Sequence, residues 1–68
     1  MKISARNILK GTIVDVRKGV TTAHVRIDVN GVIVTASITN ESVDDLQLAA
    51  GKPAFAVIKS SDVMVGVE

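Results

Sequence analysis

The fold of this chain is decided by residues 23–34, which read AHVRIDVNGVIV. Over residues 23–30 apolar side chains alternate with polar ones, a period of two that is typical of a β-strand buried on one face. Asn30 and Gly31 then interrupt the pattern before a second apolar run at residues 32–39. An Asn-Gly pair between two strands predicts a type I′ turn, because both positions of that turn need positive φ. The stretch therefore predicts an antiparallel hairpin.

Further strands are predicted on both sides of this hairpin. Residues 8–17 form the strand before it, and Gly19 supplies a turn or bulge between the two. A fourth strand runs over residues 53–59, beginning at the only proline of the chain. A turn at residues 60–62 leads to a fifth strand at residues 63–67.

A short helix is predicted between the third and fourth strands. Ser42 with Asp45 three positions later resembles a capping box, so we expect Ser42 to be the N-cap of a helix that ends before Gly51. Three strands, a helix and two strands predict an all-β fold. Specifically, we expect a small five-stranded barrel of the OB (oligonucleotide/oligosaccharide-binding) type, with one short helix between strands 3 and 4.

Composition indicates a small domain that needs partners. The chain has 68 residues, a single Phe, and no Trp, Tyr or Cys. Chains below about 70–80 residues rarely build a sufficient core without a disulfide, a metal or assembly. No cysteine is present for a disulfide or thiolate site, and His24 alone cannot form a zinc site. We therefore expect one domain over residues 1–68 that forms a homo-oligomer by sharing apolar surface.

The charge of the chain is nearly balanced. Eight Lys and Arg residues stand against seven Asp and Glu, for a net charge of +1. This balance gives no general attraction to nucleic acid or to anionic lipid. No signal peptide follows Lys2, and no run approaches the roughly 18 apolar residues of a membrane span. We expect a cytoplasmic protein with no nucleic-acid or membrane partner.

Two segments near opposite ends of the chain carry most of its chemistry. They are Ser4-Ala5-Arg6-Asn7 and Lys59-Ser60-Ser61-Asp62, and each joins a cation to a hydroxyl and backbone donors. Arg offers a planar fork of donors, Lys a point charge, and Ser hydroxyls further hydrogen bonds, a combination that suits a small, multiply charged oxyanion. A surface Arg or Lys is more often simply solvated, but strand ends and loops are where ligand groups commonly lie.

Three further positions are weaker candidates. Ser42 can cap the helix or offer its hydroxyl to an anion, and Thr39 is either an ordinary strand residue or a second hydroxyl donor. The Lys18-Gly19-Val20 turn permits close approach of the backbone to a ligand. No nucleophile–base pair, metal loop or Gly-rich phosphate loop occurs in the sequence, so we expect a binding protein and no enzyme.

Taken together, these segments resemble the molbindins (Mop), small molybdenum–pterin-binding proteins that consist of one molybdate-binding domain of the transport-associated OB (TOBE) type. The resemblance covers essentially the whole chain. It is carried by residues 4–7 with Leu9 and Gly11, by residues 18–20, by Ile38-Thr39 with Ser42-Val43, and by residues 59–64.

The resemblance implies binding of molybdate, and also tungstate, as the tetrahedral dianion, with no other cofactor and no metal held directly by side chains. It further implies a hexamer, built as a trimer of dimers, with oxyanion sites between subunits. Residues 4–7 would supply one side of a site, Lys59 and Ser60 of a neighbouring chain the other, and Thr39 and Ser42 further hydroxyls. The implied oxyanion-binding residues are Ser4, Ala5, Arg6, Asn7, Thr39, Ser42, Lys59 and Ser60. Lys18, Gly19 and Val20 are candidates for a second site on the three-fold axis.

A chain of this length has no room for the DNA-binding or ATPase parts that accompany the same domain in regulators and transporters, so we expect a role in molybdenum storage or buffering. Two other functions remain open. An OB-type nucleic-acid-binding module would use stacking aromatic residues and a basic groove, which a near-neutral chain with one Phe lacks. A purely structural oligomerisation domain would bind no anion.

Overall fold

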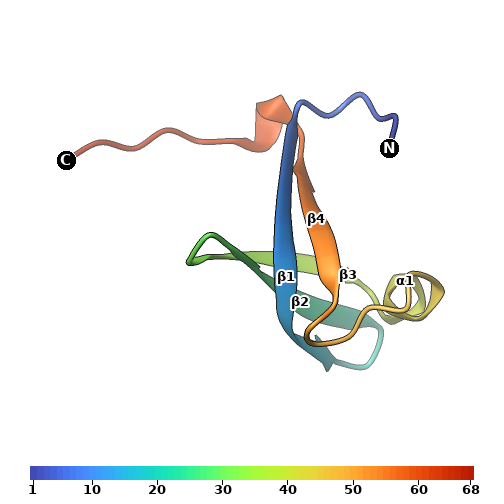
Figure 1. The fold of residues 1–68 in the computed structure, drawn as a ribbon. Helices are drawn as coiled ribbons and strands as arrows, with labels where there is room; N and C mark the ends of the chain where they lie inside the picture. The colour runs from blue at the N-terminus through green and yellow to red at the C-terminus, as the bar shows by residue number, and fades with distance from the viewer.

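The structure is a computed structural model that describes residues 1–68. Its elements are β1 (Asn7–Lys18), β2 (Thr22–Val29), β3 (Val32–Thr39), α1 (Asn40–Asp45), β4 (Pro53–Ile58) and a 3₁₀ turn, η1 (Ser60–Asp62). The four strands form one antiparallel sheet in the order β3-β2-β1-β4. The β1–β4 pair crosses the β2–β3 pair at a steep angle, so the sheet is strongly curved (Figure 1). The expected small OB-like β fold is confirmed.

The β2–β3 hairpin has the predicted turn. Asn30 and Gly31 adopt φ values of 51° and 90°, and Val29 pairs with Val32 across the turn. The Gly31 N–H donates to Oδ1 of Asp28 at 2.7 Å, which holds the turn from within. Positive φ at both central residues is the type I′ geometry that matches the twist of the two strands.

β1 curves because it is shared between two partners. Its first half pairs with β4 from Asn7 to Thr12, and its second half pairs with β2 from Thr12 to Lys18. The β1–β2 register shifts between Ile13 and Asp15, and such a bulge bends and twists a strand. The bend lets one strand serve both halves of a barrel-like sheet.

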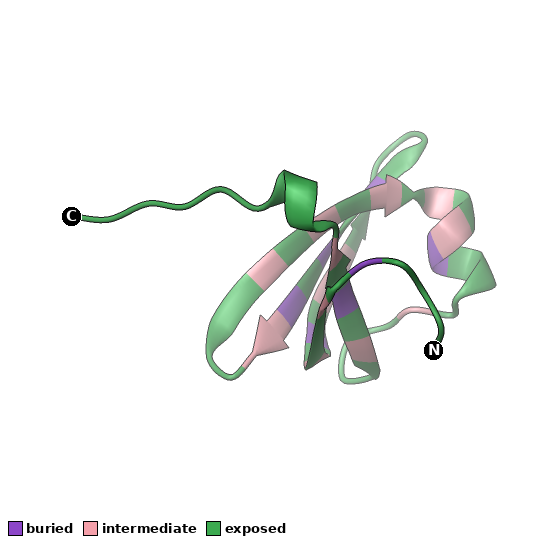
Figure 2. Cartoon of the chain, turned by 90° about the horizontal axis from the view of Figure 1, so that it is seen from above, coloured by how far each residue is buried: buried purple, intermediate pink, exposed green.

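The core is small and aliphatic. Seven of the 68 residues are buried, and six of them form one cluster. Most of the chain is therefore exposed or half-buried (Figure 2). The cluster consists of Ile13, Ala23, Val25, Ile27, Val43 and Ala56. Val43 is the only buried residue of α1, so this short helix is fixed to the sheet by one side chain.

The predicted N-cap at Ser42 is wrong, because the helix begins at Asn40 and its N-cap is Thr39. Oγ1 of Thr39 accepts a hydrogen bond of 3.0 Å from the Ser42 N–H. Thr39 ends β3 with φ −73° and ψ 151°, and this extended conformation is the one an N-cap needs. Thr39, the last residue of β3, is thus also the N-cap of α1.

The predicted fifth strand at residues 63–67 is not formed. After η1 the chain runs outward from the body in an extended conformation, with every residue from Val63 onward exposed (Figures 1 and 2). The Asp62 N–H donates to the Lys59 carbonyl and the Val63 N–H to the Ser60 carbonyl. These bonds direct the chain away from β4, so the alternating valines find no strand to pair with in their own chain.

The single α-helix has six residues, and no helix of the structure has the length and apolar character to cross a lipid bilayer.

Candidate functional site

The beginning of β1 and the end of β4 lie side by side at one end of the sheet (Figure 1). Asn7 pairs with Ile58, and its side-chain Nδ2 donates to the Ile58 carbonyl at 3.2 Å. Arg6 and Lys59 are the next residues outward from this pair. The structure therefore places Arg6 and Lys59 at the same end of the sheet, and we call residues 4–7 with Lys59 and Ser60 the tip cluster.

The tip cluster is rich in unused hydrogen-bond donors. The backbone N–H groups of residues 4–6 and of Ser60 and Ser61 donate to no acceptor in the protein. Ala5 is buried, while Ser4 and Arg6 on either side of it are exposed. Exposed backbone N–H groups on a fixed segment are suited to an anion.

Its positive charge is also uncompensated. The structure contains two ion pairs, Lys18 with Asp44 and Arg26 with Asp15, and neither involves Arg6 or Lys59. The carboxylate nearest in sequence, Asp62, makes no ion pair. Two cations without acidic partners match the charge of a dianion, and hydrogen bonds between charged groups are the strong ones.

The other predicted residues lie at the opposite end of β1. Thr39 pairs with Thr22 there, and the Asn40 Nδ2 donates to the Gly19 carbonyl at 2.9 Å, which ties the start of α1 to the β1–β2 turn. We call Lys18, Gly19, Val20, Thr39 and Ser42 the base cluster. Its one cation, Lys18, is already paired with Asp44, so the base cluster attracts an anion less than the tip cluster does.

One hydroxyl of the base cluster keeps a proton to donate. The Thr39 hydroxyl donates to Oγ of Ser42 at 2.8 Å and accepts from the Ser42 N–H. The Ser42 hydroxyl accepts from Thr39, so its own proton is free for a ligand.

Asn40 is a residue that the sequence reasoning missed. Its side-chain Nδ2 bridges the Gly19 and Val20 carbonyls, at 2.9 and 3.3 Å, and its Oδ1 is buried without a partner. The available signal was an Asn directly after a capping Thr, since Asn side chains readily bond to nearby backbone groups.

The two clusters are too far apart to hold one anion within a single chain. The twelve residues of β1 separate them by a strand of roughly 40 Å contour length, at about 3.3 Å per residue. Donors must lie within about 3 Å of the oxygens they bind. The resemblance implied that Lys59 and Ser60 reach residues 4–7 from a neighbouring chain. Within one chain, Asn7 pairs with Ile58, the residue before Lys59.

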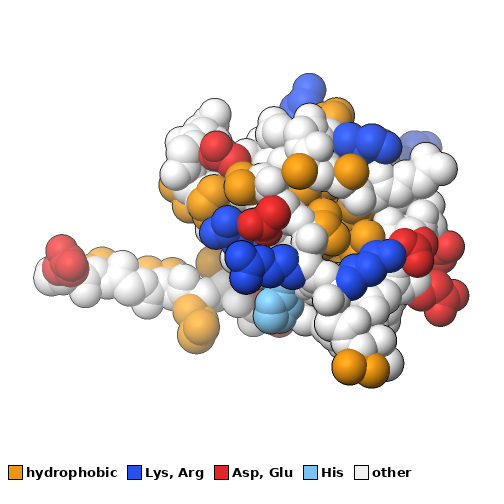
Figure 3. All heavy atoms as spheres, turned by 90° about the horizontal axis from the view of Figure 1, so that it is seen from below, with side chains coloured by type: hydrophobic (Ala, Val, Ile, Leu, Met, Phe, Trp, Pro, Cys, Tyr) orange, Lys and Arg blue, Asp and Glu red, His pale blue; other side chains and the backbone are white.

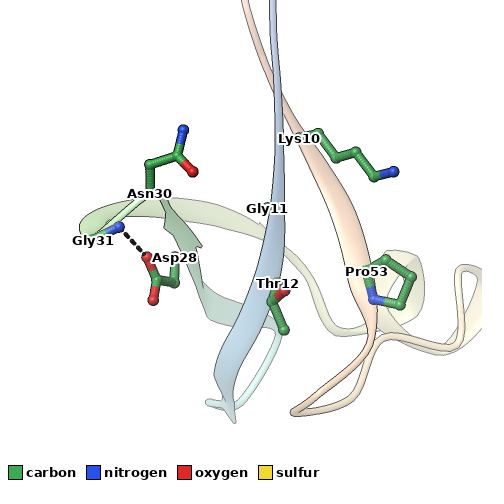
Figure 4. Close-up of a pocket in the computed structure, with 7 residues that line it drawn as sticks. All are labelled: Lys10, Gly11, Thr12, Asp28, Asn30, Gly31 and Pro53. Carbon is green, nitrogen blue, oxygen red and sulfur yellow. Dashed lines mark hydrogen bonds between the residues drawn. The ribbon is translucent and has the colours of Figure 1, made fainter.

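A third polar region lies in the bend of β1. A pocket of about 390 Å³ is lined there by Lys10, Gly11, Thr12, Asp28, Asn30, Gly31 and Pro53 (Figure 4). None of these is a predicted site residue. The pocket contains one cation and one carboxylate, so its formal charges cancel. The pocket therefore offers a dianion no net electrostatic attraction.

The resolved pKa shifts lie on the β1–β2 pair, away from both clusters. Hydrogen bonds from the Arg26 guanidinium, with Nη2 at 2.8 Å from Oδ2, hold the pKa of Asp15 below its ordinary value of 3.8. The same carboxylate raises the pKa of Arg26.

On the face shown in Figure 3, basic side chains lie next to acidic ones and form no continuous basic track. No group of three His, Cys, Asp or Glu side chains is placed to hold a metal ion.

Comparison with known proteins identifies the family of the chain. The TOBE domain family matches residues 3–65. Molybdenum-pterin-binding protein 3 of Clostridium pasteurianum is 48% identical over 66 residues, covering 96% of this chain and 97% of that protein. The structure of a molybdate-binding protein from Sporomusa ovata superimposes with a TM-score of 0.94 at 37% identity, covering 98% of this chain and all of that one.

A further solved structure, the cytoplasmic molybdate-binding protein ModG with molybdate bound, matches with a TM-score of 0.82 at 41% identity. It covers 96% of this chain and 53% of ModG. The curved sheet is that of a small OB-like β fold, and the matched relatives are described as binding proteins. The chain belongs to the TOBE-domain family and, within it, to the molbindins.

Proposed function

We propose that this chain is a molybdate-binding protein, that its residues 1–68 act as one binding domain, and that it takes tungstate as well. The observation that carries the proposal is the tip cluster. There Arg6 and Lys59, neither in an ion pair, flank the Asn7–Ile58 pair beside five unused backbone N–H groups. The similarity to proteins described as binding molybdate supports the same ligand here.

The chemistry of the tip cluster favours a fully deprotonated dianion. Two unpaired cations balance two negative charges, and Ser4, Ser60 and the backbone supply donors to the remaining oxygens. Phosphate near neutral pH carries a proton that needs an acceptor, and a site made of donors leaves that proton unsatisfied. Sulfate is also a dianion, so the site would have to distinguish it from molybdate by the smaller size of sulfate.

We further propose that complete sites form between copies. The tip cluster of one copy would meet the Thr39 and Ser42 hydroxyls of another, in a homo-oligomer of the hexameric kind, a trimer of dimers. Support comes from the separation of the two clusters along β1 and from the free proton of the Ser42 hydroxyl. A second site at Lys18, Gly19 and Val20 would require Lys18 to leave Asp44.

In the cell this binding would serve cytoplasmic storage or buffering of molybdenum and no catalysis. An anion that binds only the assembled form also stabilises it, by RT ln(1 + [L]/Kd). The nucleic-acid alternative gains nothing from the structure, because the chain has no Trp or Tyr and its only Phe, Phe55 on β4, has no second ring of this kind beside it to form a stacking platform.

The test is a calorimetric titration with sodium molybdate, with and without excess sulfate, on protein of known oligomeric mass. Arg6→Ala and Lys59→Ala should each weaken binding by about 10- to 150-fold, since each removes a charge-assisted hydrogen bond of about 1.5–3 kcal/mol. Lys10→Ala is the matched control, because Lys10 is an exposed cation of β1 outside both clusters. It should bind like the parent.

Equal affinity of the Arg6, Lys59 and Lys10 variants would show that the tip cluster is not the site. Absence of any heat, together with an unchanged melting temperature in millimolar molybdate, would leave only a structural role. Salt-dependent binding of a labelled single-stranded oligonucleotide would favour the nucleic-acid alternative.

A further inference from the structure

The chain contains three asparagine residues, Asn7, Asn30 and Asn40, and they differ in what their side chains contact. The Nδ2 group of Asn7 donates to a carbonyl of β4, and that of Asn40 donates to two carbonyls of the β1–β2 turn. Both residues are half-buried. Asn30 is exposed, and its amide group makes no hydrogen bond within the protein. Asn30 is therefore the asparagine whose side chain is free to react.

Asn30 also differs in the residue that follows it. It precedes Gly31, whereas the other two asparagines precede an isoleucine within β1 and a glutamate within α1. A neighbouring side chain and a regular element both restrict the rotation that would bring a backbone nitrogen to the preceding side chain. Gly31 has no side chain and adopts φ 90°, and a Cβ built on it would meet no atom within 4 Å. The nitrogen after Asn30 is therefore the least hindered of the three.

These features match the chemistry by which an asparagine loses its amide. The Gly31 nitrogen gives up its proton to solvent and forms a bond with Cγ of Asn30. The bond between Cγ and Nδ2 breaks, and Nδ2 takes up a proton and leaves as ammonia, so that a succinimide ring remains. One water molecule then opens the ring. Addition at Cγ leaves an aspartate at position 30, and addition at the main-chain carbonyl leaves an isoaspartate. The balance is asparagine and water giving one of these two acids and ammonia, with no oxidant or reductant.

The structure also contains a group that opposes this reaction. The Gly31 N–H donates to Oδ1 of Asp28 at 2.7 Å, and in Figure 4 the Asn30 amide points away from this hydrogen bond. The hydrogen bond has to break before the nitrogen can turn towards Cγ. The Asp28 carboxylate also disfavours loss of the N–H proton, because that loss would place two negative charges side by side. Asp28 thus slows the reaction both by its hydrogen bond and by its charge.

We infer that Asn30 is a site of spontaneous deamidation in the folded protein, and that Asp28 sets the rate by holding the Gly31 N–H. The turn lies at the exposed end of the β2–β3 hairpin, so it can open locally while the rest of the sheet stays folded (Figure 1). No residue of the tip cluster or of the base cluster takes part. The inference therefore stands or falls separately from molybdate binding.

The reaction changes the hairpin in charge and in length. A carboxylate at position 30 joins Asp28 and Lys10 in the polar pocket and lowers the net charge of +1 by one unit. An isoaspartate adds one carbon atom to the backbone of a two-residue turn. Because the turn fixes the register of a hairpin, the pair of Val29 and Val32 beside it is the first to be disturbed. Aged protein should therefore melt below fresh protein.

The first test ages the parent protein in neutral buffer at physiological temperature and follows each asparagine by peptide mass spectrometry. Tandem spectra separate Asn30 from Asn40, which lie in the same tryptic peptide, and an isoaspartate-specific methyltransferase labels the isoaspartate product. The expected result is conversion at Asn30 while Asn7 and Asn40 stay intact. Asn30→Gln is the control, because its longer side chain would have to form a larger ring, and it should take up no methyl label.

The second test removes the Asp28 carboxylate. Asp28→Ala should raise the rate of conversion at Asn30 by about 2- to 12-fold, the factor that corresponds to one hydrogen bond of ordinary strength. Asp45→Ala is the matched control, because Asp45 is an exposed carboxylate of α1 that makes no hydrogen bond with the hairpin, and it should react at the rate of the parent. Asp28→Asn keeps an uncharged oxygen acceptor, so its rate should lie between those of the parent and of Asp28→Ala. Circular dichroism reports whether each variant is folded.

Conversion of Asn30 in denaturant but not in the folded parent over the same period would overturn the proposed site. So would earlier conversion at Asn7 or Asn40. A slower reaction in Asp28→Ala would show that the carboxylate promotes the reaction as a base, and an unchanged rate would show that it has no influence; either result overturns the role of Asp28. If Asp28→Ala fails to fold, the comparison of Asp28→Asn with the parent decides.

Discussion

Replacement of Gly11 by Ala tests how β1 is bent between its two partners. Gly11 lies next to Thr12, the residue at which β1 passes from β4 to β2 (Figure 4). A Cβ at position 11 would lie 2.4 Å from the carbonyl oxygen of Asp28, 2.8 Å from Cγ2 of Ile27 and 3.1 Å from the carbonyl carbon of Asp28. The first contact is to backbone, so no side-chain rotation relieves it.

The size of the effect follows from these distances. The closest contact is roughly 1 Å shorter than the optimal separation of non-bonded atoms, so β1 and β2 must move apart by a similar amount. Overpacking of this kind costs about 1–3 kcal/mol. A chain of 68 residues has a total stability of about 3–10 kcal/mol, so the loss is a large fraction of it.

The assay is thermal unfolding followed by circular dichroism, at one fixed protein concentration because the melting temperature of an oligomer depends on concentration. For a domain of this size 1 kcal/mol shifts the melting temperature by about 4–8 °C, so Gly11→Ala should melt about 5–20 °C below the parent. Lys10→Ala is the control, since Lys10 is an exposed residue next to Gly11 on the same strand. If both variants melt with the parent, β1 and β2 are not packed as closely as the structure has them.

Four further substitutions test three local features of the chain. Gln47 has φ 53° in a C-terminal cap where Gly is usual, so Gln47→Gly should stabilise the fold by about 0.5–1 kcal/mol in denaturant unfolding. Thr39→Ala should cost about 1 kcal/mol, and Ser42→Ala clearly less, because Thr39 caps α1; the reverse order would restore Ser42 as the cap. The depressed pKa of Asp15 adds stability above its unfolded value of 3.8 that is lost as the pH falls through the lower folded pKa. The melting temperature of Asp15→Asn should therefore change less than that of the parent between about pH 5 and pH 3, and parallel curves would contradict the Arg26 contact.

Short sequence patterns predicted most of the fold, because elements such as the β2–β3 hairpin depend on residues that are adjacent in the sequence. The Asn30-Gly31 turn needs only its two residues and the flanking alternation, and the hairpin formed as predicted. The helix cap was misplaced by three residues because Thr39 and Ser42 are both acceptable caps. The choice between them depends on where β3 ends. The strand at residues 63–67 was predicted from a correct pattern, but a strand also needs a partner edge, and pairing is not a property of the segment itself.

The residues of the candidate site could be proposed from the sequence, but their arrangement could be predicted only in part. Arg6 and Lys59 could be chosen from their neighbours in sequence. That they flank one strand pair follows from the antiparallel β1–β4 ladder, which no local pattern specifies. The role of Asn40 and the pairing of Lys18 with Asp44 were missed for the same reason, since both join residues more than 20 positions apart.

Assembly and anion binding are coupled if a site is shared between copies, and this coupling predicts an asymmetry between two variants. Val65 is 90% exposed in the single chain, so a carboxylate at position 65 tests whether a second copy covers this valine. Val65→Asp should then weaken molybdate binding although Val65 is no part of the tip cluster, because a site shared between copies is incomplete in the dissociated chain. Arg6→Ala should weaken molybdate binding and leave the anion-free oligomeric mass unchanged, because Arg6 belongs to the proposed anion site and assembly is expected to bury exposed apolar side chains. Calorimetry and light scattering on both variants measure the four quantities. Full molybdate affinity in a monomeric Val65→Asp would mean that one chain contains the whole site, and the contribution of Thr39 and Ser42 from a second copy would then be wrong.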